Sequence, residues 1–125
     1  MAAFVSLGLN AIPASAAGAT SCPSDGTITR WDRCTSLDNG VLSVSTTSAG
    51  NYVDVNYYRT GGGSLSAKLG YERSGNSVYS GFINMSNTPF HYSRSWSPSA
   101  SCAAFYGKLV TSGGTTYITP PADPC

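Results

Sequence analysis

Turn signals recur along this chain at short and fairly even intervals, and this spacing constrains the fold more than any other feature. The stretches between the turns have the length of strands, and none of them shows a long helical pattern. Such spacing is typical of antiparallel β structure. We therefore predict an all-β antiparallel β-sandwich of about eight strands, with a β-barrel as the alternative. The turn signals are DNG at 38–40, SAGN at 48–51, TGGGS at 60–64, SGN at 74–76, SNTP at 86–89, SPS at 97–99 and GG at 113–114.

Two stretches, at 51–58 and 64–72, alternate apolar and polar residues, which indicates strands with one buried face and one solvated face. The stretches at 78–83 and 103–110 carry apolar residues on both faces, so we expect them to lie centrally. The remaining predicted strands span residues 27–33, 41–47, 89–96 and 115–119. The predicted core positions of the alternating strands are Val53, Val55, Tyr57, Leu65, Ala67, Leu69 and Tyr71.

The chain has four cysteines, an even number that favours two disulfides in a short exported protein. We favour the pairs Cys22–Cys34 and Cys102–Cys125, because each would tie a turn-rich terminal segment to the nearest regular strand. Each closed loop would stabilise the fold by roughly 3 kcal/mol in the chain-entropy model. A zinc site is not expected, since no two cysteines have the close spacing of zinc ligands and the chain has one histidine.

The first residues have the character of a signal peptide. Residues 2–17 form an uncharged, largely apolar run that ends in small residues, so we predict cleavage after Ala16 or Ala17. No Lys or Arg precedes Arg30, so the basic n-region is missing and the leader is expected to be truncated. The run is shorter than the roughly 20 residues of a membrane helix, so no membrane span is predicted. Residues 18–125 are then one β-rich domain of a secreted, extracellular protein.

The charge and the motifs exclude several classes of partner. A net charge of +1 with no basic cluster makes nucleic acid an unexpected partner. The glycine-rich stretch at 60–64 lacks the following Lys and helix of a phosphate-binding loop, so we predict a hairpin loop there. No cofactor is predicted.

The sequence contains one histidine, His91, which is the candidate centre for catalysis. A nucleophile would need such a base beside it, but no G-x-S-x-G elbow occurs and nothing in the sequence links His91 to one serine. Two carboxylates, Asp54 and Glu72, lie on the polar faces of predicted neighbouring strands, where solvated surface acids are the ordinary explanation. We assign no catalytic residue and keep a small secreted hydrolase centred on His91 as an alternative.

Aromatic residues give the main positive indication of function. One face of the predicted strand at 89–96 carries aromatic rings and an arginine, and two further tyrosines fall on the polar side of the strand at 51–58. Such side chains bind sugars and protein surfaces well, although cross-strand packing in the core is the competing explanation. The candidate ligand-binding residues are Tyr92, Arg94, Trp96, Tyr52 and Tyr58.

These observations favour a secreted, non-enzymatic recognition module. Its expected ligand is an extracellular polysaccharide or a secreted or surface protein, bound through exposed aromatic strand faces. A cell-surface structural component is a further alternative, which fractionation with the envelope or with the supernatant would distinguish.

Overall fold

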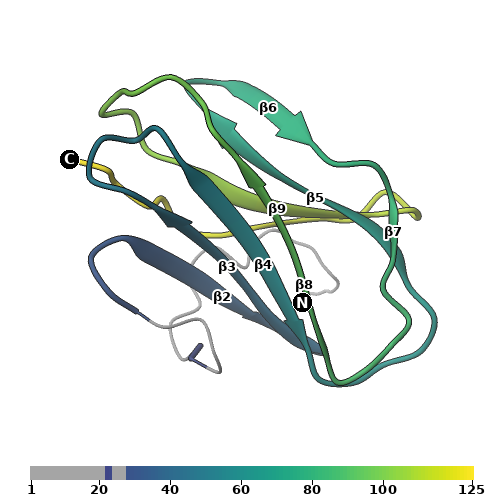
Figure 1. The fold of residues 1–125 in the computed structure, drawn as a ribbon. Coiled ribbons are helices and arrows are strands. Elements are labelled where there is room, and N and C mark those ends of the chain that lie inside the picture. Colours follow the sequence, from purple (N-terminus) through teal and green to yellow (C-terminus); the bar gives the residue numbers. More distant parts are fainter. Residues whose placement is uncertain (1–21, 24–27) are drawn as a thin grey trace, which may run out of the picture.

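The computed structural model describes residues 22–23 and 28–125, so the predicted signal peptide at 1–17 lies outside the described residues. The described part forms two antiparallel sheets, which face each other as two layers (Figure 1). The prediction of an all-β sandwich is confirmed, and the sheets do not close into a barrel. No described segment is a helix long and apolar enough to cross a membrane.

The first sheet contains four strands in the order β2-β3-β4-β8. The Asp38-Asn39 turn joins β2 to β3, and β4 lies between β3 and β8, so β4 is paired along both edges. The strands are β2 (Asp32–Leu37), β3 (Gly40–Thr46), β4 (Val53–Arg59) and β8 (Phe90–Trp96).

The second sheet has the order β10-β9-β5-β6, and β7 also pairs with β5. The predicted turn at 113–114 connects β9 to β10, and Gly114 has a φ of 95°, which a residue with a side chain adopts only with strain. The strands are β5 (Ser66–Arg73), β6 (Asn76–Tyr79), β7 (Ile83–Asn84), β9 (Tyr106–Thr111) and β10 (Thr116–Ile118).

The hydrophobic core lies between the two sheets, where β3 and β4 face β9 and β5. The predicted alternation is confirmed on β4 and β5, whose inward side chains are buried, while Leu65 packs at the edge of the core. The buried core cluster consists of Leu42, Val44, Val53, Val55, Tyr57, Ala67, Leu69, Tyr71, Met85, Tyr92, Phe105, Leu109 and Ala122.

Two of the strand predictions differ from the structure, and one expected central strand is confirmed. The strand expected at 27–33 begins later, at Asp32, because β2 pairs with β3 across the Asp38-Asn39 turn. The strand expected at 78–83 is not central: it is divided between β6 and β7, at the margin of the second sheet. The strand expected at 103–110 does contribute a central strand, β9, between β10 and β5.

The TGGGS segment at 60–64 is not a hairpin loop, because the strands on either side of it, β4 and β5, belong to different sheets. The buried Arg59 holds this crossover by donating hydrogen bonds to the carbonyl oxygens of Gly63 and Met85. A Cβ atom at Gly62 would lie 2.7 Å from Nη2 of Arg59, and Gly62 has a φ of 97°. Glycine therefore allows the loop to cover this arginine.

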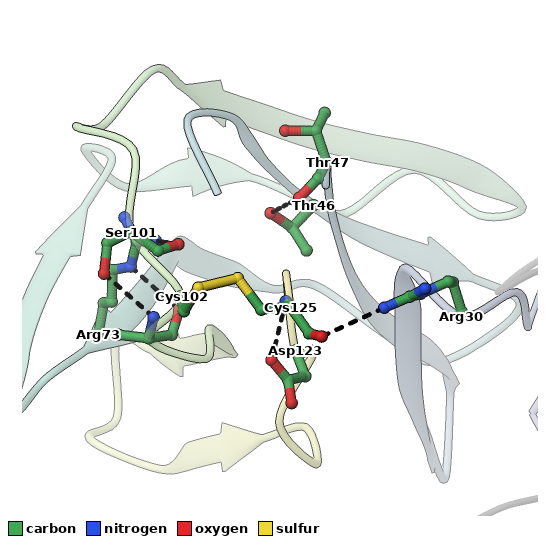
Figure 2. The surroundings of a disulfide bond; sticks show 9 residues. Arg30, Thr46, Thr47, Arg73, Ser101, Cys102, Asp123 and Cys125 are labelled. Carbon is green, nitrogen blue, oxygen red and sulfur yellow. Dashed lines mark hydrogen bonds between the residues drawn. A yellow bond between two sulfur atoms is a disulfide. The ribbon is translucent and has the colours of Figure 1, made fainter. Parts of the chain in front are cut away.

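Both predicted disulfides are present, Cys22–Cys34 and Cys102–Cys125. The second one fastens the segment that follows β10, as Figure 2 shows. Packing also holds this segment in place, because Ala122 pairs with Phe105 and is completely buried. The disulfide therefore covalently closes a contact that hydrophobic packing already favours.

Arg73, at the end of β5, holds the loop that contains Cys102 (Figure 2). Its guanidinium group donates to the carbonyl oxygens of Ser99 at 2.8 Å, Ser101 at 2.7 Å and Ala103 at 3.2 Å. It also lies 4.2 Å from the ring centroid of Phe105. One side chain thus links β5, the loop and the core.

We expect Arg73→Ala to lower the free energy of unfolding by about 2 kcal/mol, since it removes three charge-assisted hydrogen bonds, two of them in exposed positions. Urea denaturation followed by circular dichroism measures this change. Arg94→Ala is the matched control: Arg94 is exposed and, among the described residues, donates only to its neighbour Ser93, so its loss should cost less than about 0.5 kcal/mol. Equal effects of the two substitutions would contradict the importance of the Arg73 contacts.

Replacing Cys102 and Cys125 together by serine should lower the free energy of unfolding by roughly 3 kcal/mol, because the cross-link closes a loop with a sequence separation of 23 residues. The fold should persist at room temperature, since Ala122 and Phe105 still pack. Thermal unfolding with and without a reducing agent provides the measurement. A double-serine variant as stable as the oxidised protein would show that the disulfide adds nothing to the packed tail.

Candidate ligand-binding face

The outer surface of the first sheet, facing away from the core, is lined with polar side chains in register. Residues directly opposite one another on antiparallel strands project from the same face, so the strand pairing arranges these side chains in three rows. We call this surface the outer polar face. Its rows are Asp32, Ser45, Asp54 and Ser95; Cys34, Ser43, Asn56 and Ser93; and Ser36, Val41, Tyr58 and His91.

A continuous chain of hydrogen bonds runs across this face from Tyr52 to His91. The Tyr52 hydroxyl donates to Oγ of Ser95 at 3.0 Å. The Ser95 hydroxyl in turn donates to Oδ1 of Asp54 at 2.9 Å. The Asn56 amide nitrogen donates to Oδ2 of Asp54 at 3.1 Å. Oδ1 of Asn56 lies 2.7 Å from Nε2 of His91. Each side chain is therefore held in place by its neighbours.

When the His91 ring carries a single hydrogen, this network determines which nitrogen holds it. Because the Asn56 amide nitrogen is directed at Asp54, its oxygen faces His91 and accepts the hydrogen from Nε2. Nδ1 is then the acceptor nitrogen. The His91 side chain is exposed, and its ring stacks on Tyr58 with centroids 4.1 Å apart and planes inclined by 16°. The ring is thus oriented by one hydrogen bond and one stacking contact.

The outer polar face carries negative charge without a matching cation. Its rows contain two carboxylates, Asp32 and Asp54, and no Lys or Arg. Asp32 accepts hydrogen bonds from Ser45 at 2.6 Å and from Thr29, and Asp54 accepts them from Ser95 and Asn56. In the described part of the chain, neither carboxylate forms an ion pair. The rows of the face therefore carry carboxylates that no Lys or Arg of the described residues pairs with.

The two sides of the face differ in accessibility. On the β2–β3 side, Cys22, Cys34 and Val41 form a small buried cluster around the first disulfide. On the β4–β8 side, Tyr52 is 38% exposed and His91 is exposed. The accessible strip runs along β8 from Ser95 to His91, a distance of about 13 Å at roughly 3.3 Å per residue.

The structure places the five candidate residues from the sequence in two different environments. Tyr58 belongs to the outer polar face, and Tyr52, just before β4, donates a hydrogen bond to Ser95 of that face. Tyr92, Arg94 and Trp96 project from the opposite side of β8, toward the second sheet.

Tyr92 is part of the hydrophobic core, being 7% exposed, and its hydroxyl donates to the carbonyl of Asn87 at 3.0 Å. Trp96 is half-buried and meets the Tyr71 ring edge to face, with centroids 5.2 Å apart. Arg94 is exposed at the edge of the sheet. Tyr92 and Trp96 are therefore packing residues, whereas Arg94 and Phe90, which lies on the same side of β8 and is 50% exposed, remain open to solvent.

Sequence reasoning missed Asn56 and Ser95 as members of the site. Their importance comes from strand register, which places Ser95 opposite Asp54 and Asn56 two residues farther along β4. Alternation alone identifies the face but not the partners across it. Asp54 and Glu72, considered as a possible pair of acids, lie in different sheets, and Glu72 instead pairs with Lys108 at 2.8 Å.

The chemistry available on this face is hydrogen bonding by fixed hydroxyl, carboxylate and imidazole groups beside two aromatic rings. Among the described residues, no group of three His, Cys, Asp or Glu side chains is placed to hold a metal ion. The described hydrogen bond of His91 goes to Asn56 rather than to a hydroxyl group. The arrangement is suited to holding a polyhydroxyl ligand.

Comparison of the chain with protein-family models, with curated proteins and with solved structures found no match in any of the three.

Proposed function

We propose that this chain is a secreted, non-enzymatic recognition module that binds a neutral extracellular polysaccharide along the outer polar face. The observation that carries the proposal is the hydrogen-bonded chain from Tyr52 to His91, which holds a row of donors and acceptors in fixed positions on rigid strands. Preorganised groups of this kind lose little entropy when a ligand binds.

The charge of the outer polar face and the length of its accessible strip indicate the class of ligand. Two carboxylates that form no ion pair in the described part of the chain disfavour an acidic polymer, whereas sugar hydroxyl groups can donate to Asp54 and to Nδ1 of His91. Tyr52 and the stacked pair of Tyr58 and His91 lie at opposite ends of the strip. A ligand that contacts both ends must be an oligomer, because the ends are about 13 Å apart by the rise of a strand.

Secretion is supported by two features of the chain. The cysteines form two disulfides, which persist in oxidising compartments. The first residues also fit the pattern of a signal peptide. A protein exported in this way meets cell-wall and environmental polysaccharides.

We expect Tyr52→Ala and His91→Ala each to weaken retention on an insoluble neutral polysaccharide at least about fivefold, because each removes one end of the strip. Cellulose, chitin and mannan are suitable probes in a pull-down followed by affinity electrophoresis. Tyr52→Phe keeps the ring and removes only the hydrogen bond to Ser95, so its effect should be smaller. The matched control is Phe82→Ala, which removes a 56% exposed ring that lies in the loop between β6 and β7 and outside the rows of the outer polar face.

All four variants should keep the circular dichroism spectrum of the parent, since none of the replaced side chains belongs to the buried core. The proposal fails if none of the neutral polymers retains the parent protein, or if Tyr52→Ala and His91→Ala are retained as well as Phe82→Ala. Recovery of a stable complex with a secreted protein, together with no retention on polysaccharide, would favour protein recognition instead.

A hydrolase centred on His91 is the second candidate, and the contact between Asn56 and His91 favours it. A general base is often oriented by a third group in this way. This candidate requires an activity that His91→Ala abolishes and Phe82→Ala preserves, measured with chromogenic glycoside and ester substrates. Binding of polysaccharide without release of product would exclude hydrolysis of that polymer.

A further inference from the structure

The outer surface of the second sheet has a chemical character different from that of the outer polar face. Strand pairing places Tyr79 opposite Gly70 and Gly70 opposite Lys108, and Lys68 and Glu72 lie on the same side of β5 as Gly70. Phe82, in the loop between β6 and β7, lies close enough to contact Lys68. We call these residues, Lys68, Tyr79, Phe82, Lys108 and Glu72, the aromatic–lysine surface.

Gly70 determines the position of the Tyr79 ring. A Cβ atom at Gly70 would collide with Cδ1 of Tyr79 and with the backbone carbonyl of Val78, so the ring lies directly across the glycine. An aromatic side chain that covers a glycine on a neighbouring strand stays close to the sheet and is held there. Tyr79 is half-buried, and the neighbouring Phe82 is 56% exposed. This side of the sandwich therefore presents aromatic area that is not part of the core.

Lys68 brings positive charge to these rings. Its Nζ lies 4.6 Å from the centroid of Tyr79 and 5.4 Å from that of Phe82. Within the described part of the chain, Lys68 forms no ion pair, so its charge is not neutralised by a carboxylate. Both aromatic contacts are compatible with an anion on the far side of the ammonium group.

Lys108 supplies a second ammonium group near Tyr79. It pairs with Glu72 at 2.8 Å, and it donates to Ser77 at 3.3 Å. Burial lowers the pKa of Lys108, but the hydrogen bond with Glu72 and the nearby Tyr79 raise it, and the net shift is upward. Lys108 therefore remains charged, and the surface carries two lysines against one glutamate.

We infer that the aromatic–lysine surface is a second binding site, separate from the outer polar face, and that it takes a carboxylate-bearing polysaccharide. The 56% exposed ring of Phe82, beside the half-buried Tyr79, supplies apolar area for a sugar ring. Lys68, which forms no ion pair among the described residues, supplies the cation for a sugar carboxylate. The two sites belong to the outer faces of different sheets, so neither has a residue in common with the other. The outer polar face and the aromatic–lysine surface carry charges of opposite sign, so the two sites bind different polymers.

The test uses the oxidised full chain and three soluble probes: polygalacturonate, its fully methyl-esterified form, and a neutral glucan. Esterification removes the carboxylate charge and keeps the sugar rings. We expect affinity electrophoresis to show binding of polygalacturonate that weakens at least about tenfold on esterification. We expect a weakening of similar size between 50 and 500 mM salt, since the screening length falls from roughly 14 to roughly 4 Å in that range.

Single substitutions test whether polygalacturonate binds at the aromatic–lysine surface. Lys68→Gln removes the charge and keeps most of the side-chain length, and Phe82→Ala removes the most exposed ring; each should weaken polygalacturonate binding at least about fivefold. Tyr52→Ala is the matched control, because it alters the outer polar face alone and should leave polygalacturonate binding unchanged. Amide shifts in nitrogen-15 NMR spectra should move at residues 68, 79 and 82 rather than at 52, 58 and 91.

The inference is overturned if the methyl ester binds as tightly as the acid, if Lys68→Gln binds like the parent, or if polygalacturonate does not bind. Concentration-dependent self-association in analytical ultracentrifugation that Lys68→Gln abolishes would also overturn it, because the surface would then contact a second copy of the chain. The outcome of the polygalacturonate test does not depend on the neutral-polysaccharide site, since the two sites respond to different probes and different variants. Loss of neutral binding in Tyr52→Ala with polygalacturonate binding intact would separate them completely.

Discussion

The packing of β4 and β5 against each other is the constraint on which the rest of the structure depends. Val53, Val55 and Tyr57 are buried from one side, and Ala67, Leu69 and Tyr71 from the other. Because a strand repeats every two residues, burying these side chains directs all their neighbours outward. The chemical character of both outer faces is therefore a consequence of core packing. A shift of one residue in register would bury Asp54 and expose the valines.

Much of the fold could be predicted from the sequence because its signals are local. Alternation identified the inward residues of β4 and β5, the glycine pair at 113–114 identified a hairpin, and the terminal positions of the cysteines led to the correct pairings. The crossover at 60–64 was missed because a glycine-rich loop can connect strands of one sheet or of two. Only the partners of β5 decide between them, and β5 pairs with β9 rather than with β4.

The candidate site was predictable only in part, since it depends on contacts between strands that are distant in sequence. Tyr52 and Tyr58 were identified because they interrupt an alternating pattern. The hydrogen bonds of Asp54 with Ser95 and of Asn56 with His91 join residues that are 41 and 35 positions apart. Aromatic content alone could not distinguish Tyr92, a core residue, from Tyr58, which faces outward. That distinction is made by the side of the sheet on which each residue lies.

Arg94 has a consequence for how copies of this molecule behave beside one another. It lies on β8, an edge strand of the first sheet, on the side that faces the second sheet, yet it remains exposed. A foreign strand that aligned along β8 would have to enclose this guanidinium group, which disfavours such an alignment. The charge therefore disfavours pairing of another chain with β8, an edge strand of seven residues.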